Sequence, residues 1–176
     1  MVIRLVLLLG LSLALAAEAT ELEDGTLLFG EHNPMPAAVM ALQDCGANER
    51  TYAKRRRFAD GFIFAVKCAS NHENWVETLI FSEHEDGDDG WVLWFPVPHK
   101  HGAPKDMLAN INWYPDKDEL GEIFVDRDID RDDKSYCRSE GRWRLEGPKR
   151  TPKLVFWRET EDCDGKKGWV VLVGKK

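Results

Sequence analysis

Motifs that carry catalytic chemistry are scarce in this chain of 176 residues. No serine lies in a G-x-S-x-G turn, and no glycine-rich loop of the kind that binds phosphate is present. No two cysteines have the close C-x-x-C spacing that a four-thiolate zinc site favours. The sequence therefore lends no support to nucleophilic, phosphate-binding or zinc–thiolate chemistry, and an enzyme is unsupported rather than excluded.

Positive charge is in deficit, with 24 Lys and Arg residues against 31 Asp and Glu residues and a net charge of −7. This balance argues against nucleic-acid binding, because such binding requires clustered cations that displace counterions from phosphate. Hydrophobic residues make up 43% of the chain and charged residues 31%, a globular composition that disfavours disorder and a membrane bundle. A chain of this length predicts one domain, which we place at residues 20–176.

A pronounced apolar stretch occupies residues 5–14, after Arg4 and before Ala17-Glu18-Ala19. A positive start, an apolar centre and small residues two positions apart are typical of a secretory signal peptide, predicted here over residues 1–19. The stretch is shorter than the roughly 20 residues of a membrane-spanning helix, with an uncleaved anchor as the alternative. We therefore expect a periplasmic or secreted protein with no stable membrane insertion after cleavage.

The chain has four cysteines, and all of them follow the predicted signal peptide: Cys45, Cys68, Cys137 and Cys163. An even number of cysteines in an exported chain favours two disulfides over free thiols. Three pairings are open. Cys45–Cys68 with Cys137–Cys163 is the favoured one, because each bond then closes a loop of moderate length.

One helix is expected near the N-terminus, over residues 34–45, with Asn33 as its cap and Gly46 at its end. Beyond about residue 57 apolar and polar side chains alternate, as half-buried strands require. The predicted strands are residues 26–29, 62–68, 75–82, 91–97, 108–114, 121–126, 141–145, 154–159 and 169–173. Helical connections between parallel strands are missing, so the fold class is mainly β: an antiparallel sandwich or barrel of about eight strands with one short N-terminal helix.

Two charge clusters are candidates for binding. Residues 83–90 are dense in Asp and Gly and suit an exposed hairpin loop that would attract a cationic partner, whereas the basic run at residues 54–57 is interpreted as solvated surface. Trp94 faces away from its apolar neighbours in the predicted strand, so it belongs either to a second packed face, the commoner case, or to a contact surface. The candidate partner-binding residues are Glu83, Glu85, Asp86, Asp88, Asp89 and Trp94.

Two further patterns invite a metal-binding interpretation. His99 and His101 have an H-x-H spacing, and His84 is the candidate for a third ligand if the two loops meet. Aspartates at alternate positions from 126 to 132 suggest a calcium loop, but Arg131 stands where that loop needs Gly and Cys137 where it needs Glu. Solvated loops explain both patterns more simply, so we predict no metal and no other cofactor.

The C-terminal third resembles an uncharacterised bacterial envelope family, a domain of unknown function with a D-C-G, W-x-W-x-G and C-R-G signature followed by a late Trp. The corresponding residues are Tyr136-Cys137-Arg138, Trp143-Arg144-Leu145-Glu146-Gly147, Cys163-Asp164-Gly165 and Trp169. Arg138, Leu145 and Asp164 depart from that signature. The resemblance implies a periplasmic or secreted Gram-negative protein in which Cys137 and Cys163 belong together, and it brings no known activity.

Export, acidic charge and aromatic-rich strands without a catalytic motif lead to our first hypothesis: a non-enzymatic module that binds a protein in the bacterial envelope. Its specific version is an inhibitor of, or immunity protein against, a cell-wall hydrolase, since such enzymes are often cationic. The alternatives are a small metal-dependent hydrolase using His84, His99 and His101, and a structural or stress-related envelope protein.

Overall fold

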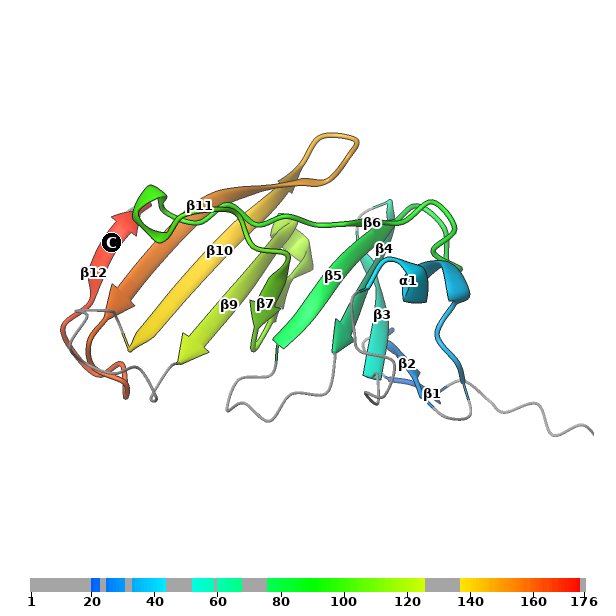
Figure 1. Cartoon of the computed structure of the whole chain (residues 1–176), viewed down its shortest axis with the longest axis horizontal. Helices are drawn as coiled ribbons and strands as arrows, with labels where there is room; N and C mark the ends of the chain where they lie inside the picture. The colour runs from blue at the N-terminus through cyan, green and yellow to red at the C-terminus, as the bar shows by residue number, and fades with distance from the viewer. Residues whose placement is uncertain are drawn as a thin grey trace, which may run out of the picture.

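A computed structural model describes residues 20–22, 25–30, 33–43, 52–58, 60–67, 76–125 and 137–174. Within these residues the fold is mainly β and sandwich-like, built of two antiparallel sheets (Figure 1), which confirms the predicted fold class. The predicted signal peptide, Cys45, Cys68 and the alternating aspartates lie outside the described residues.

The first sheet has the order β1-β2-β3-β4-β5-β6, and β7 also pairs with β5. Its strands are β1 (Thr20–Glu21), β2 (Leu27–Phe29), β3 (Tyr52–Phe58), β4 (Gly61–Lys67), β5 (Val76–Ser82), β6 (Trp91–Val92) and β7 (Met107–Ala109). The second sheet has the order β12-β11-β10-β9-β8. Its strands are β8 (Asn112–Tyr114), β9 (Glu119–Val125), β10 (Arg138–Glu146), β11 (Thr151–Thr160) and β12 (Val170–Val173). The helical segments are α1 (Ala37–Ala41) and the short 3₁₀ helices η1 (His99–His101) and η2 (Pro115–Lys117).

The two sheets meet at residues 107–114, where the sequence predicted one continuous strand. The structure breaks it at Asn110, whose φ of +47° is left-handed, so that β7 pairs with β5 and β8 pairs with β9. The Asn110 side chain donates a hydrogen bond of 2.8 Å to the Ile123 carbonyl. Asparagine tolerates the left-handed conformation better than most residues, and here it redirects the chain from one sheet to the other.

One apolar core is shared by both sheets. It includes Phe58, Ile63, Leu79 and Phe81 from the first sheet and Leu120, Trp143, Leu145 and Trp157 from the second. A smaller core on the other face of the first sheet joins Phe64, Val66 and Ile80 to Val39 of α1. Strands β4 and β5 are therefore buried on both faces.

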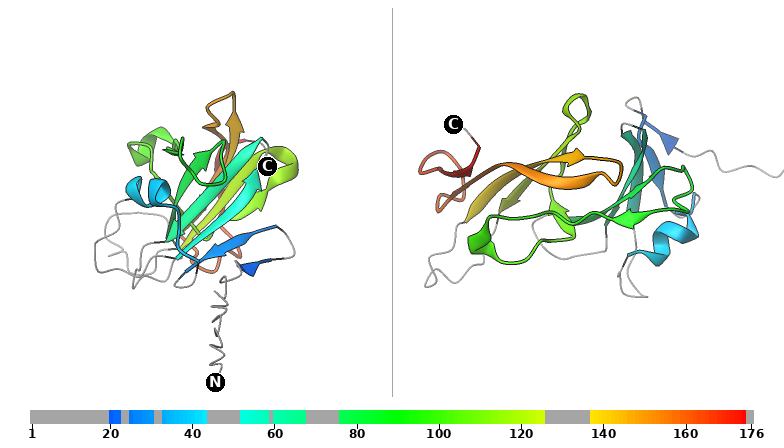
Figure 2. Two further views of the ribbon diagram at one scale, coloured as in Figure 1. Left: turned by 90° about the vertical axis from the view of Figure 1, so that its right-hand side faces the viewer. Right: turned by 90° about the horizontal axis from the view of Figure 1, so that it is seen from above.

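Residues 93–105 form a covering loop over the shared core. Leu93 and Phe95 insert into that core, and the two ends of the loop pair through hydrogen bonds between Phe95 and Lys105 of 2.7 and 3.0 Å. Seen from above in Figure 2, this green segment runs along one side of the molecule and crosses both sheets. The alternation predicted for residues 91–97 is thus confirmed for the inward side chains, but β6 ends at Val92, and Phe95 pairs with Lys105 rather than with β5.

The predicted helix is shorter than expected and lacks its predicted cap. Of the described residues 34–43 only Ala37–Ala41 are helical, and Asn33 instead donates to the Leu28 carbonyl at 2.8 Å. Pro36 explains the late start, because the residue before a proline is forced out of the helical conformation.

The basic run at residues 54–57 is also more than solvated surface, since it lies within β3, where Lys54 pairs with the buried Glu77 at 2.9 Å.

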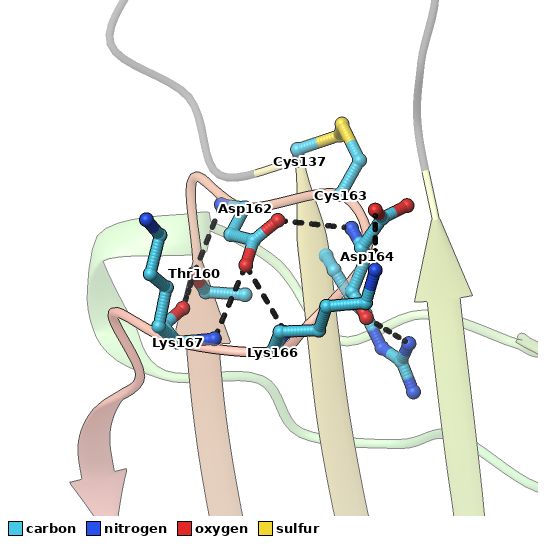
Figure 3. Close-up of a disulfide and its surroundings, with 8 residues drawn as sticks. Cys137, Thr160, Asp162, Cys163, Asp164, Lys166 and Lys167 are labelled. Carbon is cyan, nitrogen blue, oxygen red and sulfur yellow. Dashed lines mark hydrogen bonds and ion pairs between the residues drawn. A yellow bond between two sulfur atoms is a disulfide. The ribbon is translucent and has the colours of Figure 1, made fainter.

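The predicted bond between Cys137 and Cys163 is confirmed, with a Cα–Cα distance of 4.9 Å (Figure 3). It joins the start of β10 to the turn after β11. The carboxylate of Asp162 organises that turn by accepting hydrogen bonds from the backbone nitrogens of Asp164, Lys166 and Lys167 at 3.0–3.2 Å. The disulfide therefore joins β10 to a turn that is also stabilised by the hydrogen bonds of Asp162.

Substitution of Gly61 tests the packing between β4 and β5. A Cβ at this position would lie 2.5 Å from the Ser82 carbonyl oxygen and 2.6 Å from the Phe81 ring. Gly61→Ala should lower the free energy of unfolding in urea by about 1–3 kcal/mol through overpacking. Gly30→Ala is the control, because a Cβ there meets nothing within 4 Å, and its stability should be unchanged or slightly higher. Equal stability of the two variants would contradict the described packing.

Candidate functional site

The acidic loop, residues 83–90, connects β5 to β6 as predicted and is held by defined contacts. Ser82 contacts the Asp89 carboxylate at 2.5 Å and the His84 carbonyl at 2.8 Å, and Asp86 accepts from the Asp88 backbone at 3.2 Å. Gly87, with a φ of +72°, is packed so closely against Val39 of α1 that a Cβ would lie 2.3 Å from it. The loop therefore has a fixed shape against the helix.

Two of the acidic side chains have partners. Arg55 of β3 pairs with Glu85 at 3.3 Å and also donates to its carbonyl at 2.9 Å. The hydrogen bond from Ser82 holds the pKa of Asp89 below its ordinary value of 3.8. Among the described residues, Glu83, Asp86 and Asp88 are exposed and form no ion pair. The loop thus presents unpaired negative charge to solvent.

Trp94 is 56% exposed, so the prediction that it packs on a second buried face is wrong, and its part in a contact surface stays a prediction. It extends from the covering loop between two buried side chains, Leu93 and Phe95. Alternation places it on the same side as Val92, which packs into the smaller core with Val39 of α1. Trp94 therefore faces the side of the first sheet that carries α1.

The three histidines considered as candidate metal ligands do not come together. His99 and His101 lie in the 3₁₀ helix η1 rather than on one strand face, and His101 bonds to Glu159 of β11 at 2.9 Å. His84 lies in the acidic loop beside α1, which in Figure 1 is at the other end of the covering loop from η1. No cluster of three or more His, Cys, Asp or Glu residues suited to a metal occurs in the part of the chain that the structure describes. The hydrolase alternative gains no geometric support there.

Two buried carboxylates that the sequence analysis missed anchor the covering loop. Glu159 contacts both Lys100 and His101, and Glu122 contacts Lys105 and accepts a hydrogen bond from the Ala109 backbone at 2.8 Å. Burial disfavours the charged form of Glu159, but hydrogen bonds from Lys100, His101 and Trp157 outweigh burial and hold its pKa below 4.5. The partners of each carboxylate are distant from it in the sequence, so no local motif predicts these contacts.

A shallow hollow on the outer face of the second sheet was also missed. Its volume is about 330 Å³, and Gly121 of β9 forms its floor between aromatic and charged side chains from β8, β10 and β11. The alternation of charge in β10, from Arg138 to Arg144, is the sequence signal that marks this face.

In the described part of the chain, no helix has the length and apolar character needed to cross a membrane. No protein-family model, no curated protein sequence and no solved structure matches this chain. The resemblance to an envelope family therefore remains a prediction.

Replacement of Glu159 tests the anchor of the covering loop. A carboxylate whose folded pKa lies below its unfolded value stabilises the fold above about pH 4.5, and this contribution is lost as the pH falls through the folded pKa. Glu159→Gln should lower the free energy of unfolding by about 1–3 kcal/mol at neutral pH, because Lys100 and His101 lose their partner. The difference from the unmodified protein should shrink in urea titrations below pH 4.5. The control Glu161→Gln, at an exposed position two residues away, should show no such difference.

Proposed function

We propose that the mature chain is a non-enzymatic binding module that binds a cationic protein. The observation that carries this proposal is the acidic loop, in which Glu83, Asp86 and Asp88 are exposed and unpaired while the backbone around them is fixed. A loop that is already ordered loses little conformational entropy on binding. Concentrated negative charge speeds the encounter with a positively charged partner.

Exposed apolar side chains lie beside this charge. Met40 and Leu42 belong to the helical segment against which the loop packs, and they are 40% and 37% exposed. Trp94 projects to the same side of the first sheet. Interfaces combine an apolar centre, often aromatic, with a polar and charged rim, and this surface has both parts.

The disulfide supports an oxidising compartment, because such bonds persist mainly outside the cytosol. Together with the predicted signal peptide, it fits a partner in the bacterial envelope. Our specific proposal is therefore an inhibitor of, or immunity protein against, a cell-wall hydrolase, many of which are cationic.

Removal of two charges from the acidic loop tests the proposal. The mature protein is titrated against a panel of cationic muramidases and amidases by surface plasmon resonance. For a partner that binds, Asp86→Asn with Asp88→Asn should reduce the association rate about tenfold at low salt and less at high salt. Asp116→Asn with Glu161→Gln removes two exposed charges elsewhere and should change the rate little. Absence of binding by the whole panel at micromolar concentration would refute the specific version.

Trp94 should contribute to affinity but not to stability. Trp94→Ala is expected to weaken binding to the same partner by about tenfold or more, as exposed aromatic anchors do. Its free energy of unfolding should change by no more than about 0.5 kcal/mol. Tyr52→Ala, at an aromatic side chain that is 52% exposed on β3, is the matched control and should leave affinity unchanged. A Trp94 variant that loses stability and keeps its affinity would assign this residue to packing.

A further inference from the structure

The outer face of the second sheet carries a row of arginines on a chain that is acidic as a whole. The row consists of Arg138, Arg142 and Arg144 of β10 and Arg158 of β11. Each of two glutamates pairs with two of these arginines: Glu119 lies 2.7 Å from Arg144 and 3.8 Å from Arg142, and Glu140 lies 3.1 Å from Arg138 and also pairs with Arg158. Four guanidinium groups thus share two carboxylates, and the row keeps an excess of positive charge.

Aromatic rings hold the guanidinium groups in place. Arg142 lies over the Phe156 ring at 5.0 Å, and Arg158 lies over the Trp169 ring at 4.1 Å. Trp169 is itself fixed by a hydrogen bond of 2.8 Å to the Gly165 carbonyl, within the turn that the disulfide closes. A guanidinium that stacks on a ring still has its edge donors available, and its planar fork matches a carboxylate.

The hollow at Gly121 lies among these side chains. Tyr114 and Phe156 supply aromatic surface, and Asn112, Glu140, Arg142 and Arg158 supply polar groups. Gly121 is needed for this shape, because a Cβ there would lie 2.9 Å from the Tyr114 ring. A volume of about 330 Å³ is at the lower end of the range for ligand pockets, which suits one or two small rings rather than a large cofactor.

The charge of the hollow selects among anionic ligands. Arg142 and Arg158 contribute two positive charges and Glu140 one negative charge, which leaves a single positive charge to be matched. Glu122 also borders the hollow, but its carboxylate is bonded to Lys105 under the covering loop. A carboxylate carries one negative charge, whereas a phosphate monoester carries nearly two at neutral pH. The excess therefore favours a ligand with one negative charge per unit, such as a carboxylate, over a phosphate monoester.

We propose that this hollow binds an acidic saccharide, with a uronic acid unit seated against the Tyr114 ring that covers Gly121. Arg142 is the group that binds the carboxylate, because its only carboxylate partner among the described residues is Glu119 at 3.8 Å. Glu140 and Asn112 bind hydroxyl groups, since one accepts hydrogen bonds and the other both donates and accepts them. The Tyr114 ring packs against the apolar face of the sugar, whereas the Phe156 ring holds the Arg142 guanidinium in place. A nucleic acid fits less well, because the four arginines share two carboxylates and the remaining excess of two positive charges releases few counterions.

The test compares ligands that differ only in charge. Mature, disulfide-bonded protein is titrated with trigalacturonate and with its fully methyl-esterified form, and binding is followed by calorimetry and by amide NMR shifts. We expect the acid to bind with shifts at Gly121 and in β10, and the ester to bind at least about tenfold more weakly. Glucose 6-phosphate and a single-stranded oligonucleotide are included as phosphate ligands and should bind more weakly than the acid. No binding of the acid at about 10 mM, equal binding of the ester, or stronger binding of either phosphate ligand would overturn the proposal.

Two variants locate the site. Arg142→Gln removes the charge above the hollow and should weaken trigalacturonate binding by about tenfold or more. Lys153→Gln is the matched control: it removes one positive charge from β11 of the same sheet, where Lys153 pairs with Glu146 at 3.3 Å and does not line the hollow, so its affinity should change less than about twofold. Equal losses in both variants would indicate a diffuse electrostatic effect and would overturn the assignment. The acid–ester comparison on the unmodified protein decides the question even if Arg142→Gln fails to fold.

Discussion

The fold depends on how the covering loop is fastened over the core that both sheets share. Leu93 and Phe95 fill the space above Trp143 and Trp157, and the loop is held by the buried carboxylates Glu122 and Glu159. Burial of a carboxylate is costly unless hydrogen-bond donors replace water. Lys100 and Lys105 provide charged donors, and the His101 ring also contacts Glu159. The Trp143 ring nitrogen adds a hydrogen bond of 2.7 Å to the Pro96 carbonyl. Each of these contacts joins the loop to the second sheet.

The contacts that hold the covering loop also fix the proposed binding surface on the first sheet. The covering loop continues directly from β6, so its position sets where the acidic loop ends and where Trp94 projects. Trp91 spans the two sheets, because its ring nitrogen donates to the Lys149 carbonyl at 3.2 Å while its ring contacts Phe81 at 5.1 Å. The proposed binding surface, formed by the acidic loop and Trp94, is therefore held in place by contacts on the opposite side of the covering loop. Preorganisation of this kind lowers the entropic cost of binding.

Alternation of side chains was sufficient to predict the long strands β4, β5, β9, β10 and β11, because each buries at least one regular face. It failed at β3, where consecutive cations suggested solvent, since nothing local shows that Lys54 meets Glu77. It also merged β7 and β8, because Ile111 and Trp113 continue the pattern while the conformation of Asn110 breaks the strand. The helix was overextended because helix-forming residues were counted without the constraint that Pro36 places on Met35.

The two candidate surfaces differ in how well the sequence alone predicts them. The acidic loop is contiguous in the chain, so local composition was enough to predict it. The structure adds that Arg55 pairs with the Glu85 carboxylate and that Ser82 bonds to the Asp89 carboxylate. The arginine row is assembled from alternate positions of β10 and from β11, where register rather than proximity in sequence brings Arg158 beside Glu140. The two surfaces have opposite sign and lie on different sheets. Because surface charges separated by more than about 10 Å are largely screened at physiological salt, each can recognise its ligand by its local charge, and the net charge of −7 describes neither.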